Sequence, residues 1–137
     1  MRWFRTTLLL LVAVTWVENQ VAAGVRGGRF AGGFVTNLGF YGINSASFSD
    51  AGQLDYWEYG VLFGGTYAGP FTETGTGWVT SWAARVPDES PDGFADFSGV
   101  CYFGLLTSIH NQNLDQGITF DGWMIRTGSV TPQRPRH

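Results

Sequence analysis

The feature that most constrains the fold is the way glycine breaks the chain into short runs of alternating side chains. Gly occurs 20 times in 137 residues, and it favours turns because it adopts positive φ angles without a steric cost. Residues 78–85 show the alternation, with Trp, Thr and Trp on one face and Val, Ser and Ala on the other. Beyond the N-terminal segment, no stretch has a helical period. The pattern predicts an all-β fold.

Short strands separated by glycine-rich turns are typical of a sandwich or a barrel. We expect strands over residues 34–40, 41–48, 53–59, 61–67, 78–85, 97–103 and 118–127, and loops over 87–93 and 107–117. A small antiparallel up-and-down β-barrel is the favoured arrangement, because closure removes exposed strand edges. A barrel of about eight strands can hold one small ligand.

Composition excludes several classes of protein. Only 14% of the residues are charged and 16% are aromatic, whereas disordered chains are charged and poor in aromatics. All eight basic residues are Arg, and the net charge is −3. This leaves no basic stripe for nucleic acid. A helical bundle would be rich in Ala, Leu, Glu and Lys, and this chain has no Lys.

The N-terminal segment, residues 1–23, is predicted to be a secretory signal peptide. Two Arg precede an apolar run over residues 6–17, and Val-Ala-Ala closes the segment. The apolar run has about 12 residues, fewer than the roughly 20 that span a bilayer. We expect cleavage after Ala23 and a secreted, extracellular or periplasmic protein with no membrane association afterwards. A retained anchor or a chance apolar start is the alternative.

The processed chain is expected to form one barrel domain over residues 24–130, followed by a disordered tail over 131–137. Its single cysteine, Cys101, lies in an apolar run, so a small buried residue is the simplest interpretation. An intermolecular disulfide or a reactive thiol is the alternative. His110 has Asp115 and Asp121 near it in sequence, but the spacing matches no metal-ligand pattern, and we predict no metal site.

Motifs for catalysis are sparse. There is no Gly-x-Ser-x-Gly nucleophile elbow, although a Ser/His/Asp triad can assemble from any order in the sequence. The glycine-rich segments lack the Gly-Lys-Ser/Thr ending of a phosphate loop. The acidic pairs Asp88/Glu89 and Asp50/Asp55 are interpreted as solvated turn and loop charges. We therefore expect a protein that is not an enzyme and has no cofactor.

Large aromatic residues on the expected strands are the main candidates for function. They are Trp78, Trp82, Phe97 and Trp123. Large rings bury much area at little cost in side-chain entropy. Inside a barrel they would wall a ligand slot, outside it they would form a subunit contact, and in a closed barrel they would fill the core.

Three segments resemble strands of the avidin and streptavidin family, in the family's order. Residues 77–82, Gly-Trp-Val-Thr-Ser-Trp, resemble its Gly-Trp/Phe-Thr-Val-x-Trp strand. Residues 97–102, Phe-Ser-Gly-Val-Cys-Tyr, resemble its Trp/Phe-Ser/Thr-Gly-Gln-x-Tyr/Phe strand. Residues 123–129, Trp-Met-Ile-Arg-Thr-Gly-Ser, resemble its Trp-Leu-Leu-x-Ser/Thr strand. More weakly, residues 33–39, Gly-Phe-Val-Thr-Asn-Leu-Gly, are similar to the family's opening Gly-x-Trp-x-Asn-x-Leu-Gly-Ser.

The resemblance implies an eight-stranded antiparallel barrel, usually a homo-oligomer, that binds biotin as a ligand at one end. The implied aromatic walls of the biotin site are Trp82, Phe97 and Trp123. The family's tyrosine after a Gly-Thr pair would fall on Tyr67, with Tyr59 or Trp57 as alternatives.

The chain departs from the family pattern at both ends. The family's first-strand Asn falls on Thr36, or on Asn37 after a shift of one residue, and Phe40 stands where the family has Ser. Because these groups grip the ureido ring, we expect weakened biotin binding through Thr36 and Asn37.

Beyond residue 129 the family's loop Trp and its final strand with an Asp are lacking. The barrel is thus expected to be incomplete, or to be closed by residues 24–33 or by a partner chain. The alternative function is a non-enzymatic surface, filament or carbohydrate-interaction module on a β-sandwich or barrel.

Overall fold

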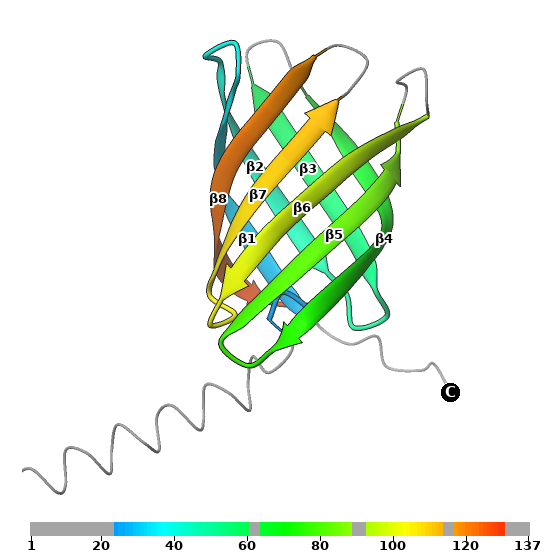
Figure 1. Cartoon of the computed structure of the whole chain (residues 1–137), viewed down its shortest axis with the longest axis vertical. Coiled ribbons are helices and arrows are strands. Elements are labelled where there is room, and N and C mark those ends of the chain that lie inside the picture. The colour runs from blue at the N-terminus through cyan, green and yellow to red at the C-terminus, as the bar shows by residue number, and fades with distance from the viewer. Residues whose placement is uncertain (1–23, 61–63, 89–92, 114–116, 131–137) are drawn as a thin grey trace, which may run out of the picture.

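The protein is represented by a computed structural model that describes residues 24–60, 64–88, 93–113 and 117–130. The predicted signal peptide (1–23) and tail (131–137) lie outside the described residues. The described chain is all-β and forms one closed barrel (Figure 1). Its strands are β1 (Gly28–Thr36), β2 (Tyr41–Phe48), β3 (Gln53–Gly60), β4 (Gly64–Thr76), β5 (Val79–Pro87), β6 (Phe94–Tyr102), β7 (Leu106–Asn113) and β8 (Ile118–Ser129).

The barrel has the simple up-and-down topology that the strand pattern predicts. Each strand pairs antiparallel with the next, and β1 pairs with β8 from Gly28 opposite Ser129 to Thr36 opposite Phe120. Closure therefore leaves no unpaired edge in the sheet. No helix within the described ranges is long and apolar enough to cross a membrane.

The expectation of a missing strand is wrong, because the segment predicted as a loop over 107–117 contains β7. On this strand Thr107, Ile109 and Asn111 are buried, and Ser108 and His110 alternate with them on the outer face. The period of two is present. Two of the three inward residues are polar, however, so the strand carries little of the apolar signal that sequence patterns rely on.

The N-terminal boundary is also wrong, because β1 starts at Gly28 rather than at residue 34. The early start lets β1 pair with β8 along its length, so the chain closes its own barrel. The absence of a side chain at Gly32 allows β1 and β8 to approach closely. A Cβ there would overlap the backbone carbonyl oxygen of Trp123 on β8. The same glycines that suggest a turn in the sequence are positions of close backbone approach in the sheet.

Aromatic rings fill the interior in two groups. We call the end of the barrel that carries the β1–β2 turn, at the top of Figure 1, the upper end. The lower group centres on Phe48, whose ring lies 5.7 Å from Phe30, 5.2 Å from Phe71 and 4.9 Å from Trp82. The upper group comprises Phe34, Tyr56, Tyr67, Phe97 and Phe120.

Residues before β1 close the lower end. Val25 is fully buried, and its N–H donates to Oε2 of Glu73 at 2.8 Å. The same carboxylate oxygen accepts from Oγ1 of Thr80 at 2.8 Å. Because a buried valine and these hydrogen bonds occupy the lower end, a ligand would reach the interior from the upper end.

Candidate functional site

A buried polar cluster lies at the upper end, which we call the Glu58 cluster: Asn44 on β2, Tyr56 and Glu58 on β3, and Tyr67 on β4. The exposed fractions of Asn44, Tyr56 and Glu58 are 3%, 2% and 7%. The alternation of β3 points Tyr56 and Glu58 to the same inward face as Leu54. Asn and Glu are rarely buried to this degree unless they are partnered.

Hydrogen bonds link the members of the Glu58 cluster. Nδ2 of Asn44 donates to the Tyr56 hydroxyl at 3.2 Å, and that hydroxyl donates to Oε2 of Glu58 at 3.2 Å. Tyr67 also hydrogen-bonds to the Glu58 carboxyl group. Oδ1 of Asn44, in contrast, is buried and accepts no hydrogen bond. Leaving a buried acceptor unpaired costs about 1–3 kcal/mol, so this atom marks a position where a ligand N–H would be favoured.

Burial controls the protonation of the cluster. It raises the pKa of Glu58 above its ordinary value, the Tyr56 and Tyr67 hydrogen bonds partly oppose this, and the charge of Asp88 adds to it. Burial, together with the neighbouring Glu58 carboxylate, also raises the pKa of Tyr56. The Tyr56 hydroxyl therefore stays protonated and available as a donor.

Aromatic rings surround the cluster. The Tyr56 ring lies 4.7 Å from Phe97, the Tyr67 ring 5.9 Å from Phe97, and Phe120 lies 4.4 Å from Phe34. Apolar walls around a few converging polar groups are typical of small-ligand sites. Ring faces would pack against a flat ligand while the polar groups fix its orientation.

The structure brings some of the predicted site residues together and separates others. Tyr67 and Phe97 both belong to the upper group. Trp82 is buried but belongs to the lower group, where its Nε1–H donates to Oγ1 of Thr107 at 2.8 Å. Thr36 is buried at the upper rim, and its Oγ1 accepts the N–H of Phe40 at 3.1 Å. Its hydroxyl therefore serves the β1–β2 turn.

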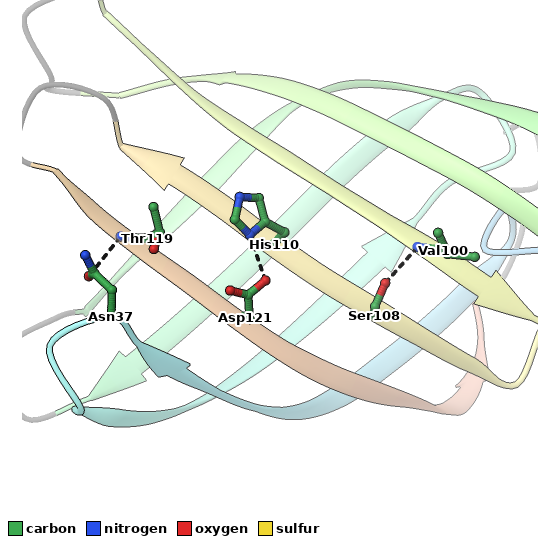
Figure 2. Close-up of polar contacts among 6 residues, drawn as sticks. All are labelled: Asn37, Val100, Ser108, His110, Thr119 and Asp121. Carbon is green, nitrogen blue, oxygen red and sulfur yellow. Dashed lines mark hydrogen bonds and ion pairs between the residues drawn. The ribbon is translucent and has the colours of Figure 1, made fainter.

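Asn37 and Trp123 lie away from the interior. Asn37 is exposed in the β1–β2 turn, where its Oδ1 accepts the N–H of Thr119 at 3.1 Å (Figure 2). Its Nδ2 donates to the carbonyl of Gly117 at 2.8 Å. Trp123 is 53% exposed on the outer face of β8, because the neighbouring Met124 faces the core. The structure therefore places Trp123 outside the interior wall that the resemblance implies.

Sequence reasoning missed Asn44, Tyr56 and Glu58. The side chains of β3 alternate in the sequence, but the face opposite to its buried residues carries two large aromatic residues. Trp57 and Tyr59, the alternatives considered for Tyr67, are exposed outside the barrel with their rings stacked at 6.4 Å. A period of two shows which residues share a face, but apolar content could not decide which face of β3 points inward.

Other reactive side chains lie outside the cluster. Nδ1 of His110 contacts Oδ1 of Asp121 at 2.7 Å on the outer face, and the nearby Ser108 Oγ accepts the N–H of Val100 at 2.9 Å (Figure 2). Within the described ranges, no group of three His, Cys, Asp or Glu could hold a metal ion. Cys101 is buried, and burial raises the pKa of its thiol to about 11. Its thiol is therefore protonated and shielded.

The upper end thus combines hydrogen-bond donors, acceptors and ring faces in one buried place. Such a combination of groups is typical of sites for small polar rings or head groups. No family model, no curated protein and no solved structure matches the chain. The function has to be proposed from the residues of the cluster and from the motifs in the sequence.

Proposed function

We propose that the protein is a secreted, non-enzymatic binding protein that takes biotin or a similar small ring compound at the upper end of its barrel. The single observation that carries this proposal is the unpaired, buried Oδ1 of Asn44 beside the Tyr56 hydroxyl and the Glu58 carboxyl group. The motifs that resemble the avidin family support a biotin-like ligand, and the small closed barrel is compatible with one.

A ureido ring has two N–H donors and one carbonyl acceptor, and the Glu58 cluster complements both. Oδ1 of Asn44 and the Glu58 carboxyl group would accept the N–H groups. In this proposal the hydroxyl of Tyr67, which hydrogen-bonds to Glu58 in the free protein, would turn toward the ring carbonyl. Phe97 and Phe120 would pack against the apolar part of the ligand. Since Thr36 and Asn37 serve the β1–β2 turn, affinity in this proposal comes from the cluster rather than from them.

Titration calorimetry of the protein with biotin, combined with thermal melting, tests the proposal. We expect saturable binding and a raised melting temperature, and we expect both to be lost in Asn44→Leu. This variant should keep the stability of the free protein, because it removes an unpaired acceptor while the Tyr56 hydroxyl keeps its bond to Glu58.

Ser45→Ala is the matched control, since Ser45 is the next residue on β2 and sits on the other face of the strand. Binding in Ser45→Ala should equal that of the unchanged protein. No heat and no shift in melting temperature at millimolar biotin would overturn the biotin proposal. Equal binding by Asn44→Leu would show that the ligand lies elsewhere.

An apolar strip on the outer face supports the expected homo-oligomer. Tyr102, Leu106 and Ile125 stand opposite one another on β6, β7 and β8, and the Trp123 ring lies 6.3 Å from Tyr102. All four are exposed in the single chain, and exposed apolar patches mark interaction surfaces. A sedimentation profile that stays monomeric at all concentrations would contradict this part of the proposal.

A further inference from the structure

We propose that the upper-end site prefers a small ring ligand that carries a planar, positively charged N–H donor group, an amidinium or guanidinium, over the same ring with a neutral ureido or amide group. This inference rests on the proposed ligand site and names the chemistry that it selects. It starts from Glu58, an acidic side chain with only 7% of its surface exposed. Its described hydrogen-bond partners are the hydroxyl groups of Tyr56 and Tyr67.

The described part of the protein provides no countercharge for Glu58. The chain contains no Lys, and the described arginines are Arg26, Arg29, Arg85 and Arg126. Each is committed elsewhere or exposed: Arg26 donates to the carbonyl of Asp50 at 2.7 Å, and Arg126 donates to that of Gly104 at 3.3 Å at the lower end. Arg85 pairs with Asp96 on the outer face at 3.4 Å, and Arg29 is exposed.

The surroundings of Glu58 add negative rather than positive charge. Asp88, which follows β5, is close enough for its charge to act on the Glu58 carboxyl group. A buried acid beside another acidic residue is costly to ionise unless a cation pairs with it. The ligand would supply that cation.

Asn44 and Glu58 stand opposite each other on β2 and β3, so the two acceptors come from neighbouring strands. The Tyr56 hydroxyl lies 3.2 Å from Nδ2 of Asn44 and 3.2 Å from Oε2 of Glu58, so one hydroxyl bridges the two side chains. A guanidinium or amidinium presents at least two N–H groups in one plane. One would donate to the Glu58 carboxylate and another to the unpaired Oδ1 of Asn44. An ammonium ion, a compact charge, lacks this geometry.

The rings around the cluster favour the same chemistry. Tyr56, Phe97 and Phe120 lie within 4.7–6.4 Å of one another and present π faces beside the acid. Planar cations stack favourably on such faces. Cation binding would also favour the ionised form of Glu58, whose pKa burial raises. Binding of a cationic ligand should therefore release protons and weaken as the pH falls through that pKa.

Two matched pairs of ligands test the inference by titration calorimetry of the full protein: biotin against 2-iminobiotin, and benzamide against benzamidine. The members of each pair have nearly the same shape but differ in charge near neutral pH. We expect the cationic member to bind roughly tenfold more tightly, the value of a charged hydrogen bond over a neutral one. Calorimetry in buffers of different ionisation enthalpy should detect proton release with 2-iminobiotin and none with biotin.

Glu58→Gln should abolish the preference for the cationic member, whereas Asp55→Asn should keep it. Asp55 lies on the same strand with its side chain on the outer face, so both variants remove one carboxylate from β3. A neutral member that binds as tightly as its cationic partner would overturn this inference and leave the proposed ligand site standing. Failure of all four compounds to bind would overturn both. Proton release that persists in Glu58→Gln would assign the titrating group elsewhere and also refute the inference.

Discussion

The hydrogen bond between Trp82 on β5 and Thr107 on β7 offers a direct test of the barrel interior. Trp82 is 2% exposed and Thr107 fully buried, and the Nε1–Oγ1 distance is 2.8 Å. Thr107→Val keeps the shape of the side chain but removes the acceptor, leaving the indole N–H unpaired in the core. The expected cost to the free energy of unfolding is about 1–3 kcal/mol. The Thr107 hydroxyl also donates to the carbonyl of Ser108 at 2.9 Å, which favours the upper part of this range.

Trp82→Phe removes the donor and part of the ring, which contacts Phe48 at 4.9 Å. Loss of the hydrogen bond and the smaller ring together should cost about 2–3 kcal/mol. In the double variant both the indole donor and the hydroxyl acceptor are absent, so no buried group of this pair is left without a hydrogen bond. Its cost should therefore be about 1–2 kcal/mol less than the sum of the two single costs.

Urea unfolding followed by far-ultraviolet circular dichroism measures these free energies, with equal slopes against urea required for the comparison. Thr74→Val, on the exposed face of β4, is the matched control and should change stability by no more than about 0.5 kcal/mol. Strict additivity of the two core substitutions would refute the reasoning. It would mean that Trp82 and Thr107 do not hydrogen-bond to each other in the folded protein.

Three further predictions follow from single side chains. Because burial raises the pKa of Glu58, the folded state holds the carboxyl proton of Glu58 more tightly than the unfolded state does. The free energy of unfolding should therefore fall as the pH rises above about 4.5. Urea unfolding at a series of pH values should show a weaker pH dependence of that free energy in Glu58→Gln. Gly32→Ala should cost more than about 1 kcal/mol in thermal melting, because its Cβ would overlap the Trp123 carbonyl, whereas Gly128→Ala, with no atom nearby, should not destabilise. Cys101 should resist a thiol reagent in the native protein and react in urea, and rapid native reaction would contradict its burial.

Local alternation predicted much of the barrel. The strand over 41–48 coincides with β2, and the prediction that Thr80 and Trp82 share one face of β5 is confirmed; the structure shows that this face points inward. On β5 the apolar residues Trp82, Ala84 and Val86 stand at alternate positions and are all buried, so the pattern identifies both the strand and its buried face. The pattern failed at β7, where Thr107 and Asn111 face inward. Polar residues are acceptable there because the closed barrel supplies hydrogen-bond partners such as Trp82 that the sequence does not reveal.

The sequence by itself determined that this protein is built from short antiparallel strands, because side-chain period and turn residues are local properties. The tertiary structure alone decided that β1 meets β8, that Trp123 faces outward beside the buried Met124, and that Glu58 faces inward beside the exposed Trp57. Each depends on register, and a shift of one residue exchanges the two faces of a strand. The candidate site is therefore a product of strand register, which gathers Asn44, Glu58 and Tyr67 from three neighbouring strands at one end of the barrel.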